Sequence, residues 1–581
     1  MSDREQVPAS GEQARTGSSW LHLPYSPATR RLLLLVWMCF LVRGFFYSSL
    51  FPLWEGYDEF SHFAYVQHLA VQGELPVLNQ TRVSREVHES VRLVPLPWML
   101  GELPPPHVTH DAYWQLPAEE REQRQQQFRA LSPEWASQPA PDDLGFFWEA
   151  QQPPLYYWLF SWPLRLAAGS ELSDRVMLLR WLSVGFASLV IPLGFLLARR
   201  VFGEDGPALG SVALVAAMPE LMVDICRVGN ESPAIVLYTL LLYFTLKMAE
   251  GPERVMSGWL LGLILGLGLL TKAYFLAALP ALALTYAWRW WRWPGERRKI
   301  VLHGAVASAV AVLLAGWWYR YNLLLTGSLT GQGDDAARRE MPLLELLGHV
   351  AEVDWYRAAD SIFFSHIWFG NWSFLQVRSW MYHSFRTIIL LAIVGLAILV
   401  WRLWRKQKDS SSLPSATHLL VLAAFYGFFW MGLAYHILVT FVNQGLSAST
   451  GWYMYSLVMA EVLLATLGLF ALCPARWHRW ILPAGTGLFV LLELYATHFL
   501  LIPYYTGLIA HKPNGHLASF YVSQFREVGL GAVLERLLVN KPAFLSASVL
   551  VVLWLLFLAA TVGLVALSVR ASQKRSSCAP T

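Results

Sequence analysis

Charged residues are scarce in this chain. Of its 581 residues only 14% are charged, whereas 55% are hydrophobic. A soluble globular protein usually carries about 25% charged residues, so a soluble fold is excluded and a polytopic membrane protein is expected. The formal net charge of +4 is small, and the basic residues occur in short clusters. This pattern argues against nucleic-acid binding and indicates topology signals at the membrane surfaces.

Cysteines and repeats are also missing where other classes of protein would need them. The four cysteines are far apart and none belongs to a CxxC pair, so neither a zinc site nor a disulfide framework is indicated. The sequence has no repeat of fixed period, which supports neither a solenoid nor an inverted-repeat transporter. The first apolar run is long and is followed by no small-residue cleavage site, so we expect it to remain as a membrane anchor.

Long apolar runs are abundant. A helix that crosses a bilayer needs roughly 20 apolar residues, so these runs predict an all-α polytopic membrane protein with about twelve transmembrane helices. The predicted spans are 31–51, 176–198, 206–223, 233–249, 256–272, 274–290, 301–320, 387–404, 417–438, 452–472, 480–500 and 546–569. A shorter candidate at 155–168 is interrupted by Pro163 and Arg165.

The basic clusters predict the topology. Clusters such as Arg30-Arg31 and Arg199-Arg200 are expected on the cytoplasmic side. All of the clusters lie on that side if 155–168 does not cross, so this segment is predicted to be an interfacial helix on the outer surface. Both termini are then cytoplasmic in a multi-pass protein of the cell membrane. The larger segments predicted outside are 52–175, 321–386, 439–451 and 502–545.

The domain organisation follows from this topology. Residues 1–29 are polar and rich in Ser and Gly, and we expect a disordered cytoplasmic tail there. Residues 30–500 are expected to form the transmembrane module, whose large first outer loop carries juxtamembrane helices. Residues 501–545 form a further outer loop, and 546–581 form the last transmembrane helix with a cytoplasmic tail.

Two adjacent carboxylates, Asp58 and Glu59, follow the first predicted span. Ionisable residues near lipid tend to mark function, and sugar transfer from a sugar phosphate needs a carboxylate to take the proton of the acceptor. Adjacent acids point apart, so one would be the catalytic base and the other would orient it or bind a cation. The alternative is that Asp58 caps a helix over 59–70.

Isolated cations occur on the predicted outer side. Arg227 lies in a short turn, Lys272 separates two spans, and Arg320 ends a third. Cations in such positions would hold the phosphate of a lipid-linked donor. The alternatives are a local ion pair of Arg227 with Asp224 or Glu231, and a lysine that snorkels to the interface.

Further polar and aromatic residues are predicted to contact the acceptor or the sugar. They are His62, Gln152, Asn230 and Tyr453. All lie on segments that the topology assigns to the outer face, although distant parts of the chain contribute them. For His62 the alternative is packing at the membrane interface, and for the aromatic residues it is lining a lipid groove.

These motifs, in their order along the chain, resemble the C-type glycosyltransferase superfamily, whose polytopic members use polyprenyl-phosphate sugars. The acid pair is similar to that of protein O-mannosyltransferases and of the lipid A aminoarabinose transferase. Residues 152–157 resemble their Pro-Pro-Leu segment, 270–272 their Leu-Thr-Lys, and 316–322 an altered form of their Trp-x-x-Arg-Asn pattern. The acid pair with His62 also resembles a family of uncharacterised bacterial membrane proteins.

The resemblance covers most of 45–325 and implies a transfer of a hexose or pentose with inversion. Asp58 would deprotonate the acceptor, which is a glycan, lipid or protein outside the cytoplasm. Lys272, helped by Arg227 or Arg320, would hold the phosphate of the polyprenyl-phosphate donor. Gln152 departs from the His or Lys that relatives often carry there, which weakens a phosphate contact at this position.

A divalent metal is a candidate cofactor, since some superfamily members use one. Asp58, Glu59 and His62 would be its ligands, although residues so close in sequence are a weak signal. Two other classes of function remain as alternatives. A lipid-linked sugar transporter or flippase would carry ionisable residues within its spans, where this chain has mainly Arg43, Arg180 and Glu461. A non-catalytic component of envelope-polysaccharide assembly would tolerate alanine at the outer acids and cations.

Overall fold

The computed structural model describes residues 26–141, 147, 149–251, 254–331, 341–405 and 416–573. Within these residues the regular structure is helical apart from two short parallel strands, β1 (Pro95–Leu96) and β2 (Val108–Thr109), in which Pro95 is opposite Val108. The predicted all-α polytopic class is confirmed. Residues 1–25 of the predicted tail 1–29, and residues 574–581, which include Cys578, lie outside the described residues, whereas 27–29 begin the first helix.

Long apolar helices make up the bundle. Among the described residues, nine are long and apolar enough to cross a membrane. They are α1 (Pro27–Leu50), α7 with α8 (Leu172–Ala187 and Val190–Phe202), α11 (Glu231–Glu250), α14 (Arg297–Thr326), α18 (Ser379–Trp404), α19 (Ala416–Gln444), α20 (Val458–Leu472) with the 3-10 turn Gly451–Leu457 before it, α21 with α22 (His478–Ala496 and Ile502–Tyr505) and α25 (Ala547–Gln573). A pair bent by 64°, α9 (Asp205–Ala217) and α10 (Pro219–Ile225), would be a tenth.

The two remaining predicted spans are helical but short. They correspond to α12 (Gly258–Leu269) and α13 (Ala278–Arg292), which are separated by a 3-10 turn at Ala273–Ala277. All of the predicted apolar runs therefore lie on helices, while the number of about twelve crossings stays a prediction. The segment predicted to be interfacial contains α6 (Leu155–Leu166), whose 12 residues are fewer than a crossing requires.

Glycines allow some of these helices to approach closely. A Cβ atom on Gly262 of α12 would overlap the carbonyl oxygen of Ala307 on α14, and one on Gly395 of α18 would overlap the carbonyl oxygen of Gly468 on α20. Because lipid is as apolar as the side chains, helices in a membrane associate through close packing of this kind.

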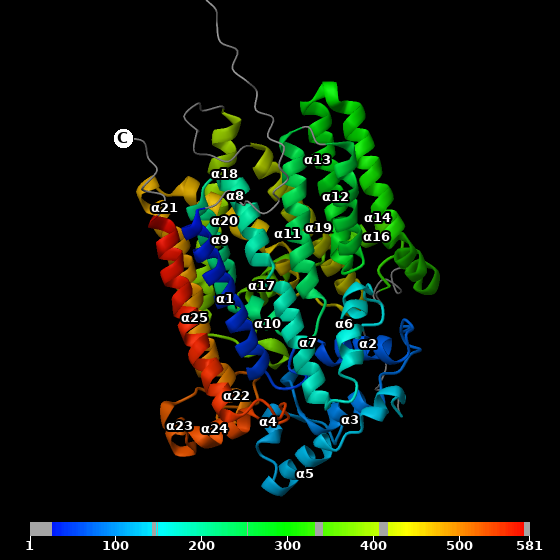
Figure 1. Cartoon of the computed structure of the whole chain (residues 1–581), viewed down its shortest axis with the longest axis vertical. Helices are drawn as coiled ribbons and strands as arrows, with labels where there is room; N and C mark the ends of the chain where they lie inside the picture. The colour runs from blue at the N-terminus through cyan, green and yellow to red at the C-terminus, as the bar shows by residue number, and fades with distance from the viewer. Residues whose placement is uncertain are drawn as a thin grey trace, which may run out of the picture.

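Short helices from two distant parts of the chain gather at one end of the bundle (Figure 1). We call the described residues of 52–154 and 502–545 the lobe. Its helices are α2 (Glu59–Val71), α3 (Arg85–Leu93), α4 (His110–Tyr113), α5 (Ala118–Arg129), α23 (Val522–Val528) and α24 (Leu530–Leu537), together with α22 at the end of the bundle. The two parts are joined by His511, whose Nδ1 lies 2.9 Å from Oδ2 of Asp111, and by Trp114, whose Nε1 donates to the carbonyl oxygen of Tyr505 at 3.0 Å.

The start of α1 and the end of α25 lie together at the opposite end of the bundle. Thr29 donates to Asp205 at the start of α9 at 2.8 Å, and a Cβ atom on Gly206 would lie 2.9 Å from the carbonyl oxygen of Ala571. The first and the last predicted outer segments therefore share one end, away from both described chain ends. Which side of the membrane the lobe faces stays a prediction.

The three charged residues singled out within the predicted spans, Arg43, Arg180 and Glu461, are paired. Arg43 on α1 bonds Glu493 on α21 at 2.5 Å, and both side chains are fully buried. Glu461 on α20 lies 2.8 Å from Nε2 of His366, and Arg180 on α7 binds Glu59. Each pair joins elements that are distant in sequence, as expected for charges that must be compensated in a low-dielectric interior.

Replacing Arg43 with Met should destabilise the protein, because Glu493 would remain buried without its cation. The expected cost is about 3–5 kcal/mol, seen as a lower Tm in thermal unfolding of the protein in detergent micelles. The double variant Arg43→Met/Glu493→Leu should recover most of the loss, since it leaves no uncompensated charge. A single variant as stable as the wild type would contradict this role.

Candidate functional site

The loop between α1 and α2 holds Asp58 immediately before its helix. Asp58 has φ 52° and ψ 21°, in the left-handed region that residues other than glycine seldom occupy. Its side chain makes no capping hydrogen bond to α2. The alternative prediction that Asp58 caps this helix is therefore wrong, and the carboxylate faces other groups.

The neighbouring acid, Glu59, has different surroundings. Its oxygens accept from Nε and Nη2 of Arg180 at 2.7 and 2.5 Å, and Oε1 also accepts from the backbone N–H of Val228 at 3.0 Å. Glu59 is fully buried. These contacts engage both of its oxygens in holding α2 against α7, so the geometry gives Glu59 an organising position and not one beside a substrate.

The turn between α10 and α11 supplies a buried group of charges. Nη2 of Arg227 lies 2.9 Å from Oδ1 of Asp224 and 2.8 Å from Oε2 of Glu231. Glu231 also forms an ion pair with Lys272, which lies between α12 and α13. The predicted local ion pair of Arg227 is thus present, and Glu231 bridges the two cations that were predicted to bind phosphate. We call Asp58, Glu149, Asp224, Arg227, Glu231 and Lys272 the charge cluster.

Asp58, which lies in a distant part of the sequence, interacts electrostatically with this group of charges. Burial raises the pKa of Asp58 above its ordinary value, and Glu231 raises it further, whereas Arg227 and Lys272 lower it. The structure therefore brings Asp58 and Lys272, which are far apart in the chain, into one electrostatic environment. A carboxylate with a raised pKa beside two cations is suited to accepting a proton near an anionic ligand.

Glu149 is a member of the cluster that the sequence interpretation did not include among the site residues. Burial, followed by repulsion from Asp58, raises its pKa to about 7. Its Oε2 atom is buried and has no hydrogen-bond partner among the described residues. Two carboxylates in one low-dielectric environment do not both ionise readily. The available signal was an acid four residues before Pro153, in the polar segment that precedes the two prolines.

Polar residues connect the cluster to α6 and α12. Nδ2 of Asn230 donates to Oε1 of Gln152 at 3.2 Å and to the carbonyl oxygen of Thr271 at 3.1 Å. Nδ1 of His62 lies 2.8 Å from the hydroxyl of Tyr157. Burial, assisted by Arg227, lowers the pKa of His62 to about 3, so its imidazole is neutral at physiological pH and serves as a hydrogen-bonding group.

Aromatic rings cover the cationic side of the cluster. Nζ of Lys272 lies 4.7 Å from the ring centroid of Tyr274 and 5.9 Å from that of Tyr453, distances at which a ring face attracts a cation. Tyr453 also interacts electrostatically with Asp58 and Glu149. The predicted contact residues His62, Gln152, Asn230 and Tyr453 therefore all lie at or near the charge cluster.

Arg320 is the predicted site residue that the structure leaves outside the cluster. It lies on α14, which continues to Thr326, and its side chain is exposed. The buried residues on this part of the helix are Tyr319 and Asn322. A Cβ atom on Gly331 would lie 3.2 Å from Cγ of Asn322 and 3.0 Å from Cβ of Gln151. Asn322 of α14 is therefore close to the 149–152 segment.

The candidate metal ligands do not share one position. Glu59 is bound to Arg180, and His62 to Tyr157. Across the part of the chain that the structure describes, no group of three or more His, Cys, Asp or Glu side chains is placed to hold a metal ion. The residues Asp58, Glu59 and His62 therefore do not form the predicted ligand set in this conformation.

Several buried polar atoms in and beside the cluster have no hydrogen-bond partner among the described residues. They are Nε and Nη1 of Arg227, Oδ2 of Asp224, Oδ1 of Asn230 and Nδ2 of Asn322. Unpaired polar atoms are costly in a protein interior and are uncommon outside functional sites. Arg227 consequently retains N–H donors that a bound anion would satisfy.

Parts of the chain are similar in sequence to known proteins. Residues 151–318 match the family model described as dolichyl-phosphate-mannose-protein mannosyltransferase. The undecaprenyl phosphate-alpha-4-amino-4-deoxy-L-arabinose arabinosyl transferase 1 of Pseudomonas fluorescens is 27% identical over 219 residues, which are 37% of each chain. The corresponding transferase of Pseudomonas paraeruginosa is 29% identical over 217 residues, or 36% of this chain and 37% of that one. The matched part is thus little more than a third of these curated relatives.

A solved structure and an uncharacterised protein are also similar. The match to the crystal structure of ArnT from Cupriavidus metallidurans bound to undecaprenyl phosphate extends over 94% of this chain and 78% of the ArnT chain, with 16% identity and a TM-score of 0.42. An uncharacterised protein of Aquifex aeolicus is 26% identical over 174 residues, 30% of this chain and 33% of that one. The family match includes Gln152, Arg227 and Lys272, and it confirms the resemblance of this multi-pass membrane protein to the C-type membrane glycosyltransferase superfamily.

Proposed function

We propose that this protein transfers a sugar, a hexose or a pentose, from a polyprenyl-phosphate donor to a glycan, lipid or protein acceptor. The observation that carries the proposal is the electrostatic interaction of the partly exposed Asp58 with two buried cations, Arg227 and Lys272. The reaction needs a base for the acceptor and cations for the departing phosphate. The names of the Pseudomonas relatives, which are transferases of an undecaprenyl-phosphate-linked sugar, support the donor class.

Asp58 is the base in this proposal. The acceptor oxygen attacks the anomeric carbon from the side opposite the phosphate, the bond from that carbon to the phosphate oxygen breaks, and the acceptor proton passes to Asp58. The configuration is therefore inverted. The raised pKa of Asp58 strengthens it as a base, and the nearby cations favour its ionised form before the reaction.

Arg227 and Lys272 bind the phosphate in this proposal. As the bond to the anomeric carbon breaks, negative charge grows on the phosphate, and buried cations stabilise it more strongly than cations in water would. Glu231 holds both cations in place, and the unpaired N–H groups of Arg227 are available to the phosphate oxygens. Arg320 has no part, because its side chain is exposed on α14.

Glu149 controls the charge of the cluster. Its raised pKa keeps a large share of its carboxyl groups protonated at neutral pH. Ionisation of Glu149 would add one negative charge beside Asp58 and would repel an anionic donor. We place the charge cluster on the extracytoplasmic side, with both termini in the cytoplasm, because the basic clusters of the sequence favour that topology.

Replacing Asp58 with Asn should abolish transfer, because the amide cannot accept the acceptor proton. Mass spectrometry of envelope glycolipids and glycoproteins from cells that lack the protein would first identify the missing sugar and its acceptor. Cells complemented with Asp58→Asn should remain deficient, with a rate at least about 10²-fold below wild type, while the variant reaches the membrane at normal abundance. Full restoration of the glycan by this variant would refute the proposed base.

Replacing Lys272 with Met should lower transfer by about 10²-fold or more, because a cation beside the developing phosphate charge is lost. Arg320→Met is the matched control: it removes an outer cation that the structure leaves exposed, and activity should stay within about twofold of wild type. The complementation assay above would measure both. Equal losses in the two variants would contradict the assignment of the phosphate to the charge cluster.

The KM for the donor should rise as the pH increases through about 7, because the pKa of Glu149 lies there and its ionisation adds a negative charge beside the phosphate. A donor phosphodiester does not titrate in this range, so its own charge is constant. In Glu149→Gln the side chain is neutral at every pH, and the KM should stay flat from pH 6 to 8. A wild-type rise that persists in Glu149→Gln would exclude Glu149 as its source.

A further inference from the structure

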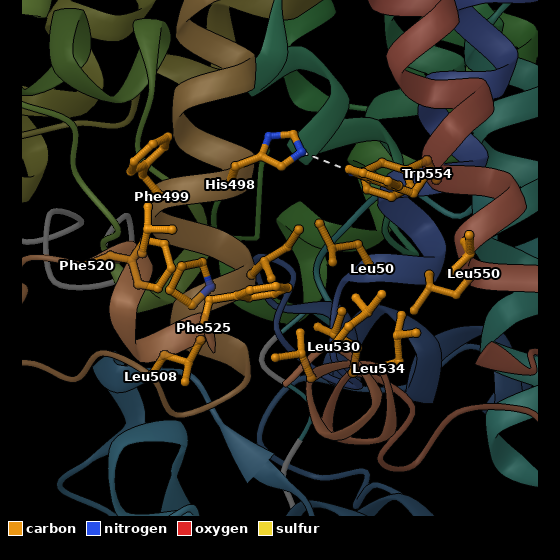
Figure 2. A pocket seen from close by; sticks show the side chains of 17 residues that line it. Leu50, His498, Phe499, Leu508, Phe520, Phe525, Leu530, Leu534, Leu550 and Trp554 are labelled. Carbon is orange, nitrogen blue, oxygen red and sulfur yellow. Dashed lines mark hydrogen bonds between the residues drawn. The ribbon is translucent and has the colours of Figure 1, made fainter. Parts of the chain in front are cut away.

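A cavity lies where the bundle meets the lobe. It has a volume of about 330 Å³ and is bounded by α1, α25, the π-helical turn with α22 that follows α21, and the α23–α24 hairpin. Figure 2 shows Leu50 and Leu550 on one side of this space, with Phe525, Leu530 and Leu534 of the hairpin below. None of the residues of the charge cluster lines it.

Hydrocarbon surrounds this cavity almost completely. Among the described residues that line it, His498 is the one with a titratable side chain, and both of its nitrogens are used: Nδ1 contacts the carbonyl oxygen of Leu494 at 2.8 Å, and Nε2 accepts from Nε1 of Trp554 at 2.9 Å (Figure 2). His498 and Phe499 reach the wall from a π-helical turn at Thr497–Leu501. Such turns are rare and occur frequently at functional sites.

A polar groove adjoins the apolar cavity. The groove has a volume of about 460 Å³, and Phe499 and Phe520 line both spaces, with ring centroids 6.0 Å apart at an interplanar angle of 75°. Its lining includes Arg378, Asn514 and His516, and none of the described residues in that lining is acidic. The apolar cavity therefore adjoins a groove whose formal charge is positive.

We propose that the cavity and the groove together bind one anionic phospholipid, with an acyl chain in the cavity and the phosphate head group beside Arg378. Two long apolar helices, α1 and α25, bound the cavity, so hydrocarbon is the medium from which it fills, and an apolar space of this size does not hold water stably. The exposed side chains of Phe499, Val522 and Leu530 form a mouth through which a chain would enter.

Charge and position distinguish this lipid from the sugar donor. The phosphate of the donor is assigned to Arg227 and Lys272, which do not line the cavity or the groove. Arg378, without an acid in the same groove, favours an anionic head group over a zwitterionic one, because the guanidinium repels the choline cation of a zwitterionic lipid and no carboxylate in the groove attracts it. The lipid site thus stands independently of whether the charge cluster transfers sugar.

Native mass spectrometry of the full-length protein in detergent tests this assignment, with phosphatidylglycerol, phosphatidylcholine and undecaprenyl phosphate as separate titrants. Phosphatidylglycerol should bind most tightly. Arg378→Gln should weaken it by about tenfold, the effect of losing one charge-assisted contact. Lys512→Gln, which removes an exposed cation that lines neither space, should leave the affinity unchanged.

The acyl chain is tested separately by filling the cavity. Leu534→Trp should abolish phosphatidylglycerol binding, whereas Glu535→Trp adds the same bulk at an exposed neighbour outside the lining and should preserve it. The Tm of each variant reports whether it is folded, and if Leu534→Trp does not fold, the comparison of Arg378→Gln with Lys512→Gln decides.

Three results would overturn the proposal. Equal affinities for phosphatidylglycerol and phosphatidylcholine, unaffected by Arg378→Gln, would exclude an anionic head group. Tighter binding of undecaprenyl phosphate, lost in Leu534→Trp, would make the cavity part of the donor path. A dimer in the mass spectrum of the wild type that Leu534→Trp dissociates would show that a second copy of the chain occupies the cavity.

Discussion

The buried pair of Arg180 and Glu59 is the interaction on which the position of Asp58 depends. The guanidinium of Arg180 donates five hydrogen bonds, two to Glu59 and three to backbone carbonyl oxygens at the end of α1 and in the loop that follows. All of its N–H donors are thus used. A buried ion pair seldom adds much net stability, but its bidentate geometry fixes direction. Here it holds α1, α2 and α7 together around a loop whose last residue, Asp58, adopts a left-handed conformation. Glycine at position 56 completes the arrangement, because a Cβ atom there would lie 2.7 Å from Cβ of Arg227.

The charge cluster is arranged to keep its cations in place before a ligand arrives. Lys272 and Arg227 are both paired with Glu231, so neither remains as an isolated buried charge. The pairing weakens the attraction of both cations for a phosphate. Burial offsets this loss, because it strengthens each new electrostatic contact. The raised pKa of Glu149 limits the negative charge of the cluster in a similar way, because a carboxyl group that retains its proton adds no negative charge beside Asp58. Burial is therefore the common cause of the basicity of Asp58 and of the affinity expected for an anion.

The sequence predicted the helices well because hydropathy is a local property, and it predicted the cluster in part. Asp58 and Lys272 were identified since each is an ionisable residue at the end of an apolar run. The position of Glu59 depends on Arg180, which is 121 residues away, and no local pattern contains that contact. Arg320 was assigned to the site because the span was expected to end there, whereas α14 continues to Thr326, nearly two turns further, and its helical phase turns this side chain outward. Glu149 was overlooked because its importance comes from burial, which the sequence around it does not reveal.

The lobe and the bundle meet at the same short segment that carries the base. Lys541, which follows α24, donates to the carbonyl oxygen of Phe51, and Arg180 donates to that same oxygen from the side of α7. The α24 helix also forms one wall of the apolar cavity, and Leu50, the last residue of α1, forms part of another. Any shift of α24 against α1 would therefore displace the backbone seven residues before Asp58. A catalytic group loses much of its effect when it is misplaced by about 1 Å. The packing of the lobe against the bundle therefore constrains the chemistry as directly as the residues of the cluster do.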